Sequence, residues 1–304
     1  MPLIVTGTIG IDTVHTPAGS AEKVLGGSCA YFAAAASFHS PVRVVAAVGN
    51  DWPAEHRAQL SQFRGIDLSG LQVRKDAKTF AWGGRYLEDI NQRETLFTEL
   101  GVLEQPPPPV PPHFCDSEFV FLANTHPAAQ LDLLAQFPSR KLAVADSMNL
   151  WINIARDQLN ELLRRLDGFV VNDEEAFLLT EVRNPITAAR RIVDLGPRFV
   201  IVKKGDNGAV LVHREGIATM PAFPAELHQV VDPTGAGDAF AGGMMGHIAA
   251  TGKTDFASIQ TALAWGTVTA SFTIESFGMA RMLEITRRDI DERMKVFQRA
   301  ARVG

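Results

Sequence analysis

The chain has 304 residues, of which 29 are lysine or arginine and 34 are aspartate or glutamate, so its formal net charge at pH 7 is −5. Because there is no basic surplus to attract nucleic acid phosphates or an anionic membrane surface, we expect neither as a partner. Hydrophobic residues make up 46% of the chain and charged residues 21%, which is typical of a globular protein and excludes a disordered or fibrous one.

The N-terminal run from Met1 to Gly7 is apolar, but it lacks the basic flank and the small-residue cleavage site of a signal peptide. The apolar stretch 26–38 is too short to span a bilayer. We therefore expect a cytoplasmic protein. The two cysteines, Cys29 and Cys115, are too few for a disulfide framework and have no metal-ligand spacing, so we expect inert thiols.

Short runs of β-branched and aromatic residues recur along the chain and are typical of strands buried on both faces of a parallel sheet. They lie at 3–6, 42–48, 119–123, 142–145, 169–172 and 199–202. Between them, helical spacing of apolar residues occurs at 54–63, 127–137, 156–166 and 187–195. This alternation predicts an α/β fold with three layers, α/β/α, around a doubly wound, mostly parallel sheet.

Two segments depart from this alternation. Residues 79–100 alternate bulky with small or polar side chains around a turn-forming Asp89-Ile90-Asn91, which predicts a solvent-facing antiparallel hairpin appended to the main sheet. The proline-rich segment 105–112 predicts a stiff, extended connector back to the main sheet rather than a ligand for a partner domain.

The most informative stretch is Asp-Pro-Thr-Gly-Ala-Gly-Asp at 232–238, which precedes a run of small and apolar residues expected to form a helix. Gly235 and Gly237 allow a tight turn, so that free N–H groups of Gly235, Ala236 and Gly237 would face an anion at the helix N-terminus. Such a site could stabilise a phosphoryl group during its transfer.

Asp238 follows directly after this turn. A carboxylate at that position could accept the proton of an attacking hydroxyl group. The alternative is that Gly-Ala-Gly-Asp only starts a helix, with Asp238 as its N-cap.

The seven-residue string resembles the C-terminal signature of the ribokinase-like, or PfkB, family of carbohydrate and nucleoside kinases. Five further segments resemble family motifs in the family's order. They are Gly7–Asp12, where the first strand leads into a lid; Gly26–Tyr31, a Gly-Gly helix start; Asp146–Asn149, an Asp-x-Asn turn with one extra residue; Asn172–Glu175, an Asn-x-x-Glu motif; and Lys203–Gly205, a strand end near the nucleotide phosphates.

The resemblance implies one ribokinase-like kinase domain over residues 1–304, with a β lid built from about 12–25 and 79–100. It implies transfer of the γ-phosphoryl group of ATP, with Mg²⁺, to a hydroxyl group of a sugar or nucleoside, and we expect a primary hydroxyl. The alternative is a non-catalytic sugar- or nucleoside-binding regulatory protein on the same fold, against which the intact Asp238 argues. The resemblance also leaves room for a homodimer.

Two cation sites are candidates. Asn172 and Glu175 would hold Mg²⁺ through its water shell, because Mg²⁺ keeps several waters and takes few protein ligands; the alternative is that they form a helix capping box. Since the family often binds K⁺ beside its anion hole, Asp232 and Thr234 are candidate K⁺ residues together with a loop around 276–278.

The candidate ATP-binding residues lie at the end of the strand 199–202. Lys203 or Lys204 would contact a phosphate, with the choice between them open, and the turn from Gly205 to Gly208 could pass close to the nucleotide.

For the acceptor, the resemblance implies contacts from Asp12, Gly26, Gly27 and Asn149. Tyr31 stands where many sugar kinases of the family carry a sugar-binding asparagine. Tyr31 and the lid residues Phe80, Trp82 and Tyr86 could provide flat surfaces for a nucleobase, or the lid aromatics could pack the lid's own small core. A nucleoside and a free sugar therefore both stay open as acceptors.

Overall fold

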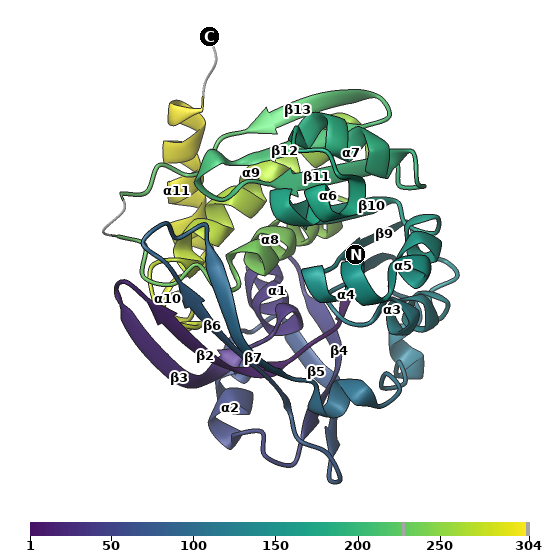
Figure 1. Ribbon diagram of the computed structural model, residues 1–304, viewed down its shortest axis with the longest axis vertical. Coiled ribbons are helices and arrows are strands. Elements are labelled where there is room, and N and C mark those ends of the chain that lie inside the picture. Colours follow the sequence, from purple (N-terminus) through teal and green to yellow (C-terminus); the bar gives the residue numbers. More distant parts are fainter. Residues whose placement is uncertain (227–228, 302–304) are drawn as a thin grey trace.

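The computed structural model describes residues 1–226 and 229–301. Its centre is a nine-stranded sheet, shown in Figure 1, made of β1 (Leu3–Thr6), β4 (Val42–Gly49), β5 (Ile66–Arg74), β8 (Phe119–Leu122), β9 (Leu142–Asp146), β10 (Gly168–Asn172), β11 (Phe199–Lys203), β12 (Ala209–His213) and β13 (Gly216–Met220). The strand order is β13-β12-β11-β10-β9-β8-β1-β4-β5. The strands from β5 to β11 run parallel, and β12 and β13 add an antiparallel edge.

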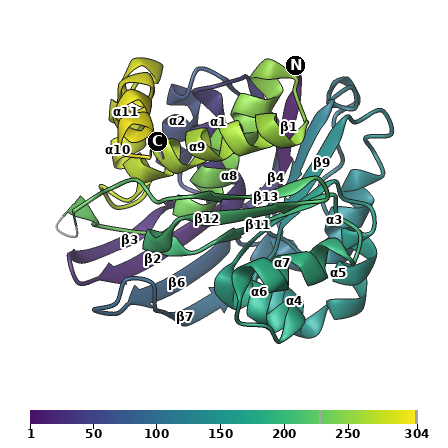
Figure 2. The same cartoon turned by 90° about the horizontal axis from the view of Figure 1, so that it is seen from above.

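Helices cover both faces of this sheet, as Figure 2 shows. One face carries α1 (Ser28–Ser37), α8 (Ala236–Thr251) and α9 (Phe256–Thr273), and the other carries α3 (Pro127–Leu134), α5 (Arg156–Leu163), α6 (Asp173–Thr180) and α7 (Pro185–Val193). The remaining helices are α2 (Ala54–Gln62), α4 (Asn149–Ile154), α10 (Ala280–Glu284) and α11 (Arg287–Ala300). The predicted three layers are confirmed.

Because helices cover both faces of the sheet, its inner strands are apolar along nearly their whole length. Successive side chains of a strand point to opposite faces, so Leu3 and Val5 join the core on the α8 side, whereas Ile4 joins the core on the α5 side. All three are completely buried. The strand therefore has no face left for polar residues, as is typical of a covered parallel sheet.

A second, four-stranded sheet stands beside the first, in the order β3-β2-β6-β7 (Figure 1). It consists of β2 (Gly10–Thr16), β3 (Gly19–Gly26), β6 (Phe80–Tyr86) and β7 (Arg93–Glu99). The strands β6 and β7 are antiparallel, with Tyr86 opposite Arg93, which confirms the predicted hairpin. We call this small sheet the lid and the segment 87–92 between β6 and β7 the lid tip.

The connector between the lid and β8 runs from Gln105 to Pro111 without helix or strand, between two short 3₁₀ helices at Gly101–Glu104 and Pro112–Phe114. This conformation agrees with the expected extended segment. Among residues 1–226 and 229–301, no helix has both the length and the apolar character needed to cross a membrane.

Candidate active site

The glycine-rich loop leads directly into α8. Gly235 is the N-cap with φ 74°, a left-handed conformation that favours glycine, and the helix begins at Ala236. A side chain at Gly235 would overlap the ring of Tyr31, which lies under the loop and is only 1% exposed. The N–H groups of the first turn of α8 are therefore held on a rigid floor, and a helix N-terminus of this kind can bind an anion.

Asp238 is the third residue of α8. The alternative in which it caps the helix does not hold, because Gly235 occupies the N-cap position, and the helix starts two residues earlier than expected. Burial raises the pKa of the Asp238 carboxyl, and the positive charges of Lys203 and Arg93 oppose that rise. A carboxylate between two cations beside a helix N-terminus is suited to accept a proton from a hydroxyl group.

Lys203 lies at the end of β11, where it is the direct neighbour of Asn172 on β10. Its side chain extends to the start of α8, so that a Cβ added to Gly237 would lie only 2.6 Å from Nζ. The charge of Lys203 lowers the pKa values of Glu175 and Asp238, which places all three groups around one point. Of the two candidate lysines, Lys203 is thus the one that reaches the loop.

A cavity of about 360 Å³ opens beside Lys203 and the first turn of α8. The turn from Gly205 to Gly208, with φ values of 55° and 76° at its two glycines, forms one side of it. Its apolar wall includes Ala209, Phe223 and Phe240. The predicted nucleotide residues therefore line one continuous space, whose size and apolar lining suit a small molecule.

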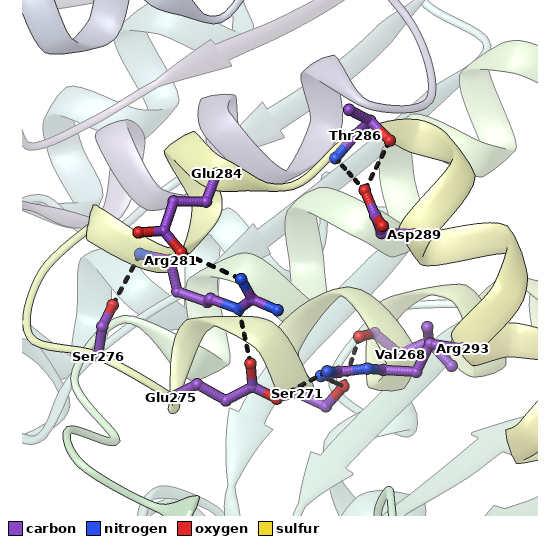
Figure 3. A network of polar contacts seen from close by, with 9 residues as sticks. All are labelled: Val268, Ser271, Glu275, Ser276, Arg281, Glu284, Thr286, Asp289 and Arg293. Carbon is purple, nitrogen blue, oxygen red and sulfur yellow. Dashed lines mark hydrogen bonds and ion pairs between the residues drawn. The ribbon is translucent and has the colours of Figure 1, made fainter.

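The helix α9 forms one wall of this cavity, and the C-terminal helix α11 supports it through polar contacts. Arg293 donates to Ser271 Oγ at 3.0 Å, and Ser271 lines the cavity. Figure 3 shows that Arg293 also pairs with Glu275, at 2.7 Å, and that Glu275 in turn accepts from Arg281 at 2.9 Å. This partly buried network fixes the end of α9.

Asn172 and Glu175 form the capping box that was the alternative to a metal role. Asn172 Oδ1 accepts from the Glu175 N–H at 2.7 Å, and Glu175 Oε2 accepts from the Asn172 N–H at 2.8 Å. Within residues 1–226 and 229–301, Oε1 of Glu175 takes no hydrogen bond, and no three acidic, histidine or cysteine side chains could enclose a metal. These residues fit Mg²⁺ held through water rather than by a protein cage.

On the lid side of Asp238, the acceptor residues Asp12, Gly26 and Gly27 meet. The Asp12 carboxylate occupies the space beside Gly26, where any side chain would overlap it, and accepts a hydrogen bond from the Gly27 N–H. Burial, assisted by the negative charges of Asp232 and Asp238, raises the pKa of Asp12 to about 7. Its Oδ1 is buried without a hydrogen-bond partner among the described residues.

Asn149 is the first residue of α4 and lies three residues after Asp146, which ends β9. Asp146 was noted only as part of a motif, yet it is buried in the site: burial and the negative charge of Asp238 raise its pKa well above the usual range. Its Oδ1 also lacks a partner in the described part of the chain. Asp146 therefore reaches the site from the strand next to β10, whereas no contact joins Asn149 to these groups in the described part of the chain.

The lid aromatics Phe80, Trp82 and Tyr86 are at most 9% exposed and pack with Val14 in a small core of their own. This arrangement corresponds to the alternative in which they stabilise the lid. The Tyr86 hydroxyl faces the glycine-rich loop, where it accepts a hydrogen bond from Thr234 Oγ1 at 3.3 Å.

Asp232, one of the candidate K⁺ residues, joins two loops. Its Oδ1 accepts from the Thr234 N–H at 2.8 Å, and its Oδ2 accepts from the Gly278 N–H at 3.3 Å. The predicted second loop at 276–278 therefore does lie against Asp232.

Sequence reasoning missed one cation, Arg93. It is the first residue of β7, lies with its guanidinium 5.1 Å from the centre of the Trp82 ring, and lowers the pKa values of Asp12 and Asp238. No local motif surrounds it. Only the pairing of β6 with β7 brings it to the site.

The chain is similar to known kinases in sequence and in fold. Residues 123–286 match the family model for pfkB family carbohydrate kinases. A cytidine kinase from Thermococcus kodakarensis is 30% identical over 249 residues, which cover 81% of this chain and 87% of that protein. Among solved structures, a nucleoside kinase of Burkholderia thailandensis in complex with inosine has a TM-score of 0.76 at 19% identity and covers 97% of this chain and 98% of its own. A protein from E. coli assigned as a ribokinase II, in complex with ATP and Mg²⁺, has a TM-score of 0.76 at 18% identity, with coverages of 97% and 99%.

Proposed function

The chain belongs to the PfkB family of carbohydrate kinases, and we propose that this ATP-dependent kinase transfers the γ-phosphoryl group to a primary hydroxyl of a nucleoside, using Asp238 as the base. One observation carries the proposal. Asp238 lies in the first turn of α8, whose residues Ala236 and Gly237 line the cavity, and it is near enough to Asp12 and Lys203 that its charge raises the pKa of Asp12 and the charge of Lys203 lowers its own pKa. Donor and acceptor would thus meet at its carboxylate.

On the donor side, the adenosine would occupy the cavity beside Phe240, with the turn from Gly205 to Gly208 along the nucleotide. Lys203 would contact a phosphate. The N–H groups of Gly235, Ala236 and Gly237 would stabilise the negative charge that develops on the transferred group. Because these donors are held in place by the helix and by Tyr31, they need no reorganisation during the reaction.

On the acceptor side, Asp12 would hold hydroxyl groups, and the backbone at Gly26 and Gly27 would lie close to the sugar. Asp238 would take the proton of the attacking hydroxyl as the O–P bond forms. Asn149 would contribute a further polar contact. The lid, which carries Asp12 and Gly26, would close over the acceptor and exclude water, which otherwise competes for the phosphoryl group.

Glu175 and Asn172 would hold Mg²⁺ through its water shell, and the ion, when bound, would neutralise charge on the phosphates. The free Oε1 of Glu175 supports this assignment, since the capping box engages only Oε2.

We favour a nucleoside over a free sugar because the names of two relatives report nucleosides: cytidine in the Thermococcus enzyme and inosine in the Burkholderia complex. Since Tyr31 and Trp82 are largely buried, base stacking on either ring requires that the lid or the loop first moves.

The test is ADP production from ATP across a panel of nucleosides, pentoses and hexoses, with kcat/KM as the readout, repeated with Trp82→Ala. Stacking of a base on an aromatic ring is worth roughly 5- to 150-fold in affinity. A nucleoside preference that disappears in Trp82→Ala supports stacking on that ring. A free-sugar preference contradicts the nucleoside assignment, and absence of turnover with every acceptor contradicts the catalytic role of Asp238.

We also propose that K⁺ binds near Asp232 and Thr234, supported by the contact between Asp232 and the 276–278 loop. Rates in K⁺, Na⁺ and a bulky organic cation at one ionic strength test this, and equal rates contradict it. A cytoplasmic location and a homodimer stay predictions, which fractionation of cells and sedimentation of the purified chain would test.

A further inference from the structure

The lid tip contributes to the cavity that the nucleotide would occupy. Ile90 and Asn91 line this space together with Lys203, Gly205 and Gly237. From this arrangement we infer that the lid tip is part of the nucleotide-binding site, so that ATP and the acceptor share the same lid. The inference rests on the proposed function and adds a binding element that no motif in the sequence indicates.

The contact between the lid tip and the nucleotide turn is direct. Asn91 Nδ2 donates to Asp206 Oδ1 at 3.3 Å, although 115 residues separate them in the chain. Asn91 Oδ1 occupies the space beside Gly205, where a Cβ would overlap it. With φ 55°, Gly205 also has a backbone conformation that favours glycine. The turn at 205–207 is therefore shaped to receive the lid tip.

The lid tip is itself ordered by hydrogen bonds that leave the Asn91 side chain facing Asp206. Asp89 Oδ1 accepts from the Asn91 N–H at 3.1 Å and from Nδ2 at 3.2 Å. Asp89 Oδ2 accepts from Gln92 Nε2 at 2.9 Å. This is an Asx turn, which positions a side chain without help from a ligand. The tip can therefore dock as a preformed unit.

The lid has a second anchor, the hydrogen bond between Thr234 and Tyr86, the last residue of β6. The same end of the hairpin thus contacts the nucleotide turn through the lid tip and the glycine-rich loop through Tyr86. Asp12 belongs to the same sheet, on β2. A nucleotide that contacts the tip therefore stabilises the lid, and Asp12 with it, in the position that closes over the acceptor. By linkage, the nucleotide and the acceptor raise each other's affinity by the same factor.

A double-mutant cycle on the full chain tests whether the contact between Asn91 and Asp206 supports nucleotide binding. The probe is the non-hydrolysable analogue adenosine 5′-(β,γ-imido)triphosphate with Mg²⁺, titrated by calorimetry without acceptor into the wild type, Asn91→Ala, Asp206→Ala and the double variant. Asp206→Ala also removes a negative charge near the phosphates, but the cycle separates that effect from the contact with Asn91. Glu88→Ala, at an exposed position of the same tip, is the matched control.

We expect Asn91→Ala to weaken binding of the analogue about 2- to 10-fold in the wild-type background, as for loss of one hydrogen bond, and to have no effect in the Asp206→Ala background. Glu88→Ala should bind as the wild type does. Hydrogen exchange in β6 and β7 should slow when the analogue binds the wild type, and slow less in Asn91→Ala. Unchanged binding by Asn91→Ala, or equal effects of this substitution in both backgrounds, overturns the inference.

The assay of ADP production across the panel of acceptors distinguishes an error in the role of the lid tip from an error in the proposed function. If the wild type phosphorylates an acceptor while Asn91→Ala binds the analogue normally, only the role of the lid tip is wrong. If the wild type neither turns over nor binds the analogue, the proposed function is wrong, and the inference is overturned with it.

Discussion

The ammonium group of Lys203 fills the space that a side chain on Gly237 would need, since a Cβ there would lie 2.6 Å from Nζ. The end of β11 and the first turn of α8 are thereby joined into one positively polarised surface. At position 237, where φ lies outside the left-handed region, a larger residue would displace the flexible end of the Lys203 side chain from this place.

Lys203→Met should weaken the use of ATP by about 10- to 150-fold in kcat/KM, because a charge-assisted hydrogen bond to phosphate is worth roughly 1.5–3 kcal/mol. Lys204→Met is the matched control, since Lys204, unlike Lys203, is not among the described residues that line the cavity, and its kinetics should stay within about twofold of the wild type. Steady-state kinetics with ATP varied at saturating acceptor provide the measurement. If Lys204→Met lowers kcat/KM for ATP and Lys203→Met does not, Lys204 is the lysine that contacts the phosphate.

Asp238→Asn should lower kcat by roughly 10²–10⁴-fold while binding of the acceptor changes little, because the amide keeps the size of the side chain but cannot accept the proton. Single-turnover measurements isolate the chemical step. If Asp238→Asn retains near-normal single-turnover rates, another group takes the proton.

Arg93→Gln should shift the acid limb of the kcat profile to higher pH. The base must be ionised, so activity falls as the pH drops through the pKa of Asp238, which burial already raises above its usual value. The Arg93 charge opposes that rise, and its removal lets the pKa of Asp238 rise further. Arg85→Gln is the control, because Arg85 is exposed and precedes Tyr86, so that its side chain lies on the opposite face of β6. An identical shift in both variants would show a general charge effect.

Asp12→Asn should make the protein more stable at pH 8 by up to about 4 kcal/mol, at about 1.4 kcal/mol for each unit of pKa difference. The pKa of Asp12 is about 7 in the folded chain and 3.8 when unperturbed. Its contribution to stability is therefore fully present below about pH 4 and is lost as the pH rises through 7. The advantage of the variant should thus grow as the pH rises over this range and disappear below about pH 4. Urea unfolding of both proteins at several pH values measures the difference in their free energies of unfolding. A difference that is constant with pH would contradict the raised pKa of Asp12.

The central part of the fold could be predicted because buried parallel strands are apolar on both faces and because amphipathic helices such as α7 show their period. The helix α9 could not. Residues 256–273 are apolar nearly all round, since α9 packs between the sheet side and α11, and no 3.6-residue period results. The antiparallel edge of β12 and β13 was not predicted, although both strands pair with chain neighbours through the short turns at 204–208 and 214–215.

The residues of the site also differ in whether the sequence alone predicts their roles. The turn from Gly235 to Asp238 lies within a few consecutive residues, so its chemistry can be derived from sequence. The contributions of Arg93 and Asn91 depend on how the lid hairpin lies over the main sheet, and neither residue has a distinguishing neighbour in the chain. For Asn172 and Glu175, one spacing serves both a capping box and a metal site, and the structure shows the first.

The carboxyl groups of Asp12, Asp146, Glu175 and Asp238 all have raised pKa values, and burial is the first cause of each. Among the described residues, the charges of Lys203 and Arg93 and a few backbone hydrogen bonds offset this crowding only in part, so the free protein is held below the stability that its core would otherwise support. Bound Mg²⁺, nucleotide and acceptor would satisfy these groups, and any ligand that binds only the folded chain raises its resistance to unfolding. Proteases in the cell degrade chiefly the unfolded form. The lifetime of this kinase should therefore follow the supply of its own substrates, and cells starved of the acceptor should clear the protein faster.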